Sequence, residues 1–188
     1  MKKYSDHFDS GHTYLYAGEC VKKDNPLVEA FGEVDELNSL IGLAVSLIKD
    51  KEAREILREI QGDLLLIGSD LANPIKKQET LDPRQTERLK RTKEMTENEV
   101  KKMEDLIMKF EKELPPLNKF ILPSGTPGAT ALQYARAVTR RVERRVVAAK
   151  METVNFQILK YFNRLSDFLF ILARIVNNRE KGKEVVWE

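Results

Sequence analysis

The sequence predicts an all-α fold: a five-helix bundle with ferritin-like up-down packing, preceded by an ordered N-terminal loop. In five long segments the apolar residues recur every three or four positions, which places them on one face of a helix. Residues that begin or end helices, such as threonine, asparagine and proline, stand between those segments. Strand-like pieces occur only near the two ends and are short. These observations favour a helical bundle over a sheet.

The first two helices follow a segment of loop-like composition. Residues 1–25 contain glycines and short polar residues and are expected to be irregular. Pro26 suits the first position of a helix, where a missing N–H is tolerated. The second helix covers about 52–72, and Asn73-Pro74 ends it because the residue before proline avoids helical geometry.

The third helix is predicted to be long and highly charged. It starts near Asp82, which fits an N-cap, and Gln85 stands at the spacing of a capping box. It runs towards Leu114, and Pro115-Pro116 end it.

The last two helices fill the C-terminal third of the chain. Thr126-Pro127 begins the fourth helix, which runs to about Met151. The fifth covers about 154–180, and residues 185–187 are expected to dock as a short tail.

Composition narrows the class of protein. The 188 residues suit one domain, and 41% of them are hydrophobic. A net charge of +2 argues against a dedicated nucleic-acid binder, which needs a strong basic excess. The single cysteine, Cys20, excludes an internal disulfide framework. The polar N-terminus does not resemble a signal peptide, and no apolar run could span a bilayer, so a cytoplasmic protein without membrane partners is expected.

The fourth and fifth helices carry charged or amide groups where a plain bundle would carry leucine. On the fourth, Arg136, Arg140 and Arg144 share a stripe, with Glu143 beside Arg140. The fifth helix is apolar on its other sides, so its polar stripe must point into protein or into a site. The members of that stripe are Asn163, Asp167, Arg174 and Asn177. Two interpretations remain open: a pocket for a charged ligand, or an internal salt-bridge network that sets helix register.

Two further segments have binding chemistry. The N-terminal one offers the glycine, hydroxyl and lysine groups of a phosphate-binding loop, although it has no Walker sequence and could be a flexible polar terminus. Its candidate residues are Asp9, Ser10, Gly11, His12, Thr13, Gly18, Lys22 and Lys23. The other is Phe120, which precedes a rigid turn and could present its ring to a cavity or plug the end of the bundle.

The first helix has a stripe of Asp35, Asn38 and Gly42, which is either a solvated acidic face or part of a site. Gly32 and Gly42 each cost about 1 kcal/mol in a helix, which suggests close helix approach or room for a ligand. No helix carries the Glu-x-x-His motif of a di-iron bundle, because both histidines precede the first helix.

Four blocks of sequence together resemble the ATP:cob(I)alamin adenosyltransferases of the PduO type. DSGHTYLYAGECVKK is similar to the N-terminal ATP loop of that family, and VEAFGEVDELNSLIGLA to its first-helix signature. FILPSG resembles its Phe-x-x-Pro-Gly-Gly turn, and ARAVTRRVER with YFNRLSDFLFILAR its most diagnostic helix pair. The chain departs from the family pattern at Phe8, Cys20, Leu27 and Ser124. The resemblance implies that residues 1–188 form a single cobalamin adenosyltransferase domain.

The resemblance also implies a reaction and its partners. The 5′-deoxyadenosyl group of ATP would pass to the cobalt of cob(I)alamin, forming adenosylcobalamin and releasing triphosphate. The alternative is a non-catalytic trimer that binds nucleotide or corrinoid to deliver or sense the cofactor. Expected partners are ATP, Mg²⁺, the corrinoid, a flavin-dependent reductase and an adenosylcobalamin-dependent enzyme. Because cob(I)alamin is itself a strong nucleophile, such an enzyme needs positioning and charge stabilisation, with no catalytic base.

The resemblance finally implies a homotrimer with active sites between subunits. The N-terminal loop of one subunit and the arginine helix of its neighbour would enclose ATP. Asp35 and Arg136 would form a salt bridge across the boundary, and the ring of Phe120 would keep the lower dimethylbenzimidazole ligand off cobalt. The phosphate-binding residues would be Ser10, Gly11, Thr13 and Lys23, with Arg140, Glu143 and Asn163 at the nucleotide and Glu143 at Mg²⁺.

Overall fold

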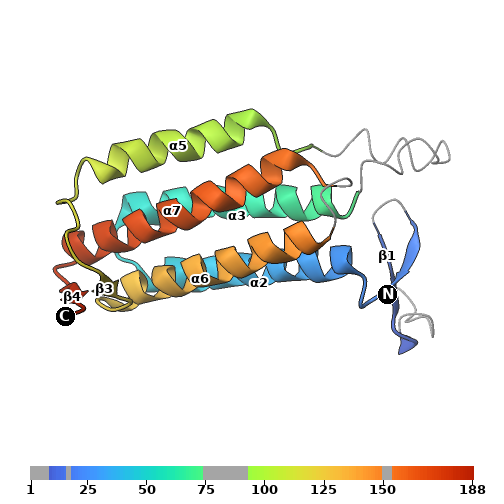
Figure 1. The fold of residues 1–188 in the computed structure, drawn as a ribbon, viewed down its shortest axis with the longest axis horizontal. Coiled ribbons are helices and arrows are strands. Elements are labelled where there is room, and N and C mark those ends of the chain that lie inside the picture. The colour runs from blue at the N-terminus through green and yellow to red at the C-terminus, as the bar shows by residue number, and fades with distance from the viewer. Residues whose placement is uncertain (1–8, 16–17, 74–92, 150–153) are drawn as a thin grey trace.

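The computed structural model describes residues 9–15, 18–73, 93–149 and 154–188. Within those ranges five long helices lie side by side, and two small two-stranded sheets stand at opposite ends of the bundle (Figure 1). The elements are β1 (His12–Tyr14), β2 (Cys20–Lys22), α2 (Pro26–Leu47), α3 (Lys51–Leu71), α5 (Glu97–Glu111), β3 (Ile121–Leu122), α6 (Pro127–Ala148), α7 (Phe156–Arg179) and β4 (Val185–Val186). The predicted all-α bundle is confirmed.

Each of these helices begins at a polar N-cap whose side chain accepts a hydrogen bond from the first turn. Asparagine, aspartate and threonine satisfy amide groups that have no partner inside a helix. Proline follows the cap in α2 and α6, where the sequence predicted it. The caps are Asn25, Asp50, Thr96, Thr126 and Asn155.

The prediction of one continuous third helix is wrong. Residues 93–96 are not helical, and α5 begins at Glu97. Thr96 and Glu99 form the capping box there, whereas the predicted box at Asp82 lies outside the described residues. The main chain before the cap is also held from outside, because the N–H of Met95 donates to Asp70 Oδ2 at 3.1 Å.

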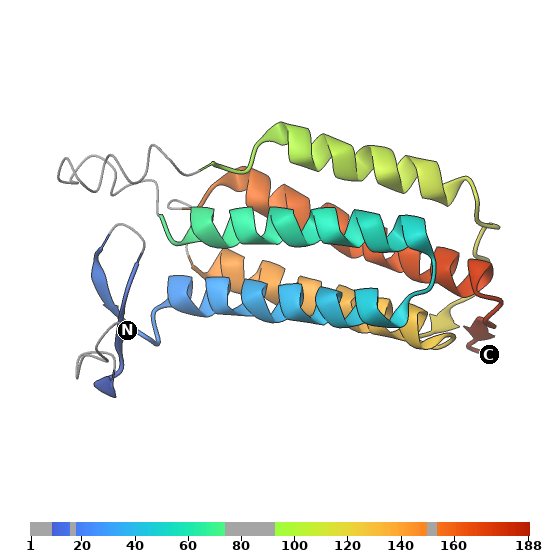
Figure 2. The same ribbon diagram turned by 180° about the vertical axis from the view of Figure 1, so that it is seen from behind.

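Helix α7 lies at the centre of the bundle and packs against α5, α3 and α6, while α2 packs against α3 and α6 (Figures 1 and 2). Its apolar side chains are buried on nearly every side, as its sequence predicted. The largest fully buried side chains include Tyr161, Phe110, Phe162 and Phe168. No helix in the described ranges combines the length and apolar character needed to cross a membrane.

The prediction that residues 1–25 are irregular is wrong for part of that segment. β1 and β2 pair antiparallel, with His12 opposite Lys22. Between them Leu15 is buried, and Gly18, whose φ of +92° suits glycine, donates its N–H to the carbonyl of Leu15 at 2.9 Å. Strands of three residues are too short to show the alternation that identifies a strand in a sequence. At the other end of the bundle, β3 and β4 pair, so the C-terminal tail docks as expected.

A buried hydroxyl joins α7 to α3, and its removal should destabilise the fold. The hydroxyl of Tyr161 donates to Asp63 Oδ2 at 2.8 Å. Burial raises the pKa of Asp63, and the hydrogen bond from Tyr161 opposes that rise. Tyr161→Phe should therefore lower the free energy of unfolding by about 1–3 kcal/mol at neutral pH, where the carboxylate loses its donor.

The loss should shrink in acid. A carboxyl group with a raised folded-state pKa stabilises the fold below its unfolded pKa, and that contribution disappears as pH rises through the folded pKa. Urea unfolding at neutral and acid pH measures the effect. Tyr134→Phe, which removes a hydroxyl from a tyrosine 57% exposed on α6, is the matched control. Equal losses from the two variants would contradict the role of the Tyr161 hydroxyl.

Candidate functional site

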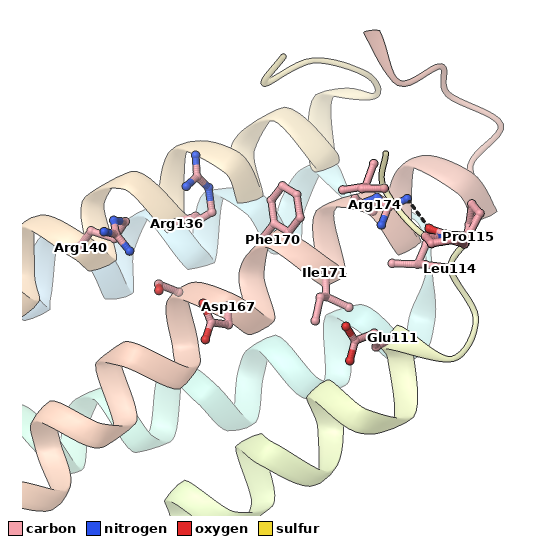
Figure 3. Close-up of a pocket in the computed structure, with 12 residues that line it drawn as sticks. Glu111, Leu114, Pro115, Arg136, Arg140, Asp167, Phe170, Ile171 and Arg174 are labelled. Atoms are coloured by element: carbon pink, nitrogen blue, oxygen red, sulfur yellow. Dashed lines mark hydrogen bonds between the residues drawn. The ribbon is translucent and has the colours of Figure 1, made fainter. Parts of the chain in front are cut away.

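Two joined cavities, here called the α6–α7 groove, run along the faces of α6 and α7. The first, of about 500 Å³, includes Arg140, Asp167 and Arg174 in its lining (Figure 3). The second, of about 550 Å³, is lined by the loop that carries Phe120. Both cavities share Leu117, Arg136 and Phe170 as walls. Together they are large enough for a substantial ligand, in the size range of small-molecule sites.

Arg136 forms the wall between the two cavities and is held in place from two sides. Its Nε donates to Gln133 Oε1 at 3.0 Å, and its guanidinium lies 6.0 Å from the centroid of the Phe170 ring. The ring face attracts the cation. Arg136 therefore presents a fixed positive charge to both cavities.

Arg140 lies one helical turn further along α6 and lines the first cavity (Figure 3). Among the residues that the structure describes, it forms no ion pair. Its neighbour Arg141 contacts Glu33 and Glu36 of α2, and these carboxylates raise the pKa of Arg141 above its usual range. Arg141 therefore ties α6 to α2, as Arg145 does through Glu29, whereas Arg140 is open to an anion.

Glu143 is half-buried on α6 and also forms no ion pair within the described ranges. The described residues contain no cluster of three or more histidine, cysteine or acidic side chains that could hold a metal alone. A single carboxylate still suits Mg²⁺, which commonly binds one or two carboxylates together with substrate phosphates. Glu143 therefore fits a metal that arrives with a phosphate ligand.

The polar stripe of α7 serves two different purposes. Asn163 and Asp167 are exposed, and Asp167 lines the first cavity. Arg174 and Asn177 are buried and fully engaged in internal contacts. The internal network predicted as one alternative is found at Arg174 and Asn177, whereas binding of a charged ligand beside Asp167 stays a prediction. Asn163 lines neither cavity, and its Oδ1 accepts a hydrogen bond from the adjacent Arg164 at 3.0 Å.

Phe120 is 79% exposed and lines the second cavity. A ring so exposed does not plug the bundle, so that alternative from the sequence is wrong. The ring meets Trp187 edge to face, with centroids 6.4 Å apart. The turn that follows tolerates Ser124, because Gly125 carries the positive φ of +117° and Ser124 does not have a positive φ.

The predicted phosphate-binding residues gather on the β1–β2 hairpin. The N–H of Lys23 donates to the carbonyl of Gly11 at 2.8 Å, and Gly11 has a φ of +81°. Ser10 Oγ lies 3.3 Å from Nδ1 of His12, and Thr13 follows in β1. This hairpin stands at the opposite end of the bundle from β3 and β4 (Figures 1 and 2). One chain therefore does not bring its hairpin to its own Phe120; Phe8, the departure before it, lies outside the described residues.

Asp35 is exposed on α2, and no ion pair joins it to another described residue of the chain. The other members of its stripe have a packing role. Asn38 exchanges hydrogen bonds with Gln61 of α3, and a Cβ on Gly42 would lie 3.2 Å from Gln61 Nε2. Gly42 thus permits close helix approach, whereas the position of a Cβ on Gly32 is open.

Sequence reasoning missed two residues that line the groove, Gln133 and Phe170, and the contact that Trp187 makes with Phe120. Gln133 and Phe170 lie in helical stretches rich in apolar residues. Only their contacts with Arg136 give them a role in the groove. Trp187 was expected to dock, but its contact with Phe120 depends on the pairing of β3 with β4. The signal available in the sequence was that the only tryptophan of the chain lies within the tail expected to dock.

Comparison with known proteins gives consistent matches. Residues 3–176 match the cobalamin adenosyltransferase family. The chain is 39% identical to a corrinoid adenosyltransferase of Bacillus subtilis (strain 168), over 100% of this chain and 93% of that protein. It is 38% identical to the corrinoid adenosyltransferase MMAB of Homo sapiens, over 99% and 73%. A variant PduO-type ATP:corrinoid adenosyltransferase from Lactobacillus reuteri, solved in complex with cobalamin and ATP, superposes with a TM-score of 0.85 at 35% identity, over 100% and 99% of the two chains.

Proposed function

The chain belongs to the cobalamin adenosyltransferase family and transfers the adenosyl group of ATP to the cobalt of a corrinoid; we propose which of its residues carry out that transfer. The observation that supports the assignment best is the groove itself. It joins a cavity lined by Arg140, which has no ion-pair partner among the described residues, to one lined by the exposed ring of Phe120. An anion site beside an apolar ring suits a triphosphate next to a corrin. The whole chain, 1–188, would form this one domain.

The reaction sets the demands on the protein. The electron pair on Co(I) attacks the 5′-carbon of ATP, the cobalt–carbon bond forms, and the bond from that carbon to the triphosphate oxygen breaks. The triphosphate leaves with both electrons of that bond, so negative charge develops on it. The chain must hold the two reacting atoms in line and stabilise the departing charge.

Arg140 is the proposed stabiliser of the departing triphosphate, because its guanidinium offers forked donors and no described residue forms an ion pair with it. Ser10, Gly11, Thr13 and Lys23 would bind the phosphates through hydroxyl, main-chain and ammonium donors. Asn163 would bind the nucleotide. Mg²⁺, held by Glu143 and the phosphates, would neutralise charge on the triphosphate.

Phe120 would occupy the lower face of the corrin and exclude the dimethylbenzimidazole ligand. Its ring is apolar, exposed and at the cavity wall, which is what exclusion without a chemical bond requires. Without that lower ligand, Co(II) is easier to reduce to Co(I). A flavin-dependent reductase would supply the electron, and an adenosylcobalamin-dependent enzyme would use the product.

The separation of the hairpin from Phe120 supports an assembly in which subunits share sites (Figures 1 and 2). In the proposed homotrimer the hairpin of one subunit covers ATP on the α6 helix of its neighbour. The exposed Asp35 of one subunit would pair with Arg136 of the next, and neither forms an ion pair within the described part of its own chain. Closed cyclic assemblies commonly share sites in this way.

An anaerobic absorbance time course with cob(I)alamin, ATP and Mg²⁺ tests the function. The light-sensitive spectrum of adenosylcobalamin should grow in with stoichiometric release of triphosphate. A flat trace, with folded protein and both ligands bound, would overturn catalysis and leave a binding or sensing role.

Subunit mixing tests the shared site. Lys23→Ala impairs the hairpin and Arg140→Ala impairs α6, so each pure variant should be nearly inactive. After equal mixing and reassembly of a trimer, about a quarter of the sites would combine an intact hairpin with an intact α6. Activity should therefore recover to about that fraction of wild type. Mixing without recovery, under conditions where labelled subunits demonstrably exchange, would contradict a site between subunits.

A further inference from the structure

The C-terminal segment 182–187 lies directly against the loop that carries Phe120. Ile121 pairs with Val186, and the N–H of Trp187 donates to the carbonyl of Phe120 at 2.9 Å. The rings of Phe120 and Trp187 then meet edge to face. The tail therefore contacts both the main chain and the side chain of Phe120.

These contacts alone hold the ring weakly. Phe120 is 79% exposed and Trp187 61% exposed, so the core packs against neither ring. A two-stranded ladder with two residues in each strand is marginal in water. A further anchor is needed if the ring is to keep one position.

Arg174 supplies such an anchor. Its Nε donates to Glu184 Oε1 at 2.8 Å. Its Nη2 donates to the carbonyl of Pro115 at 3.1 Å, the bond drawn in Figure 3. The arginine is only 7% exposed, so its charge depends on these partners. One buried cation thus ties the tail and the loop after α5 to the middle of the bundle.

Asn177, one turn further along α7, binds both the start of the C-terminal segment and the end of the loop that carries Phe120. Its carbonyl accepts the N–H of Gly182 at 2.7 Å, and its Oδ1 accepts the N–H of Thr126 at 3.0 Å. A Cβ on Gly182 or Gly125 would lie 1.9 or 2.2 Å from that same Oδ1, so only glycine fits at either position. The start of the tail and the end of the Phe120 turn are therefore held by one residue, through its main-chain carbonyl and its side chain respectively.

We propose that the Arg174–Glu184 ion pair is a positioning pair, which locks the C-terminal segment as a strap against the Phe120 loop and so fixes the Phe120 ring at the corrinoid. This inference rests on the proposed role of Phe120. Arg174 borders the first cavity of the groove, whereas Glu184 lines neither cavity and can act only through the strap. Loss of the Glu184 carboxylate should therefore lower kcat/KM for the corrinoid, because Glu184 lies outside the cavity proposed to hold the triphosphate.

The strap can be observed directly, because Trp187 is the only tryptophan of the chain. Glu184→Ala removes the tail's half of the ion pair. In the enzyme without substrates, the fluorescence anisotropy of Trp187 should fall, since the indole becomes free to move. In turnover, kcat/KM for the corrinoid should fall about tenfold through loss of positioning, while KM for ATP should not change.

Glu188→Ala is the matched control, because it removes a carboxylate from the same tail that forms no ion pair among the described residues. It should leave both the anisotropy and the kinetics unchanged. Wild-type anisotropy in Glu184→Ala would overturn the strap. Lowered anisotropy with normal corrinoid kinetics would overturn its positioning role.

A separate measurement tests the proposed role of Phe120, so that its failure can be told apart from failure of the strap. Normal activity of Phe120→Ala would remove that role, whereas the anisotropy of substrate-free Glu184→Ala would still report whether Arg174 and Glu184 hold the strap. If Glu184→Ala lowered kcat/KM for ATP as much as for the corrinoid, the variant would be generally misfolded and the proposal would be overturned.

Discussion

Arg140→Ala is expected to lower kcat by about 10²–10³-fold while the bundle stays folded. The guanidinium lies on a wall of the groove and has no ion-pair partner in the described part of the chain, so its removal breaks no ion pair there. What is lost is a preorganised donor to the triphosphate, whose charge increases only as the carbon–oxygen bond breaks. The effect should therefore fall mainly on kcat, with a smaller effect on binding of ATP.

Steady-state kinetics with ATP varied at saturating cob(I)alamin separate the two effects, and circular dichroism checks the fold. Arg58→Ala is the matched control, because it removes an exposed arginine from α3, outside the residues that line the groove. Arg140→Lys should recover only part of the loss, since an ammonium keeps the charge but lacks the forked geometry. Full activity of Arg140→Ala would mean that the triphosphate is stabilised elsewhere.

The fate of the α6 arginines shows what sequence reasoning can and cannot reach. The repeat of Arg136, Arg140 and Arg144 is local, and helical geometry alone places them on one stripe. That Arg141 is neutralised by Glu33 and Glu36 depends on how α6 packs against α2. A pattern within one helix contains no information about the carboxylates of another, so paired and open arginines look alike in the sequence.

The same division between local and long-range interactions explains which parts of the fold could be predicted. Helix positions followed from caps and apolar spacing, both of which act within a few residues. The third predicted helix ends near the predicted place, but the break before Glu97 was not foreseen, because Thr96 and the contact of Met95 with Asp70 interrupt an otherwise helical composition. The pairing of β3 with β4 joins segments more than 60 residues apart and involves too few residues to leave a pattern.

Phe120→Ala should bind corrinoid but react poorly when cob(II)alamin and a reductant are supplied. The ring is proposed to exclude the lower ligand, and alanine would leave that space open to dimethylbenzimidazole. Co(II) would then keep its lower ligand and resist reduction, so we expect a rate loss of at least about tenfold. With cob(I)alamin supplied directly, the loss should be smaller, because Co(I) no longer needs that reduction.

The comparison of the two cobalt oxidation states makes this test specific. A general defect in binding or folding would lower both rates equally, whereas a defect in ligand exclusion lowers the Co(II) rate more. Phe120→Leu keeps an apolar side chain at the cavity and should fall between wild type and alanine. Leu65→Ala removes a side chain that is 67% exposed on α3, outside the groove lining, and should change neither rate. Equal losses in both assays would leave Phe120 as a binding contact and remove its role in reduction.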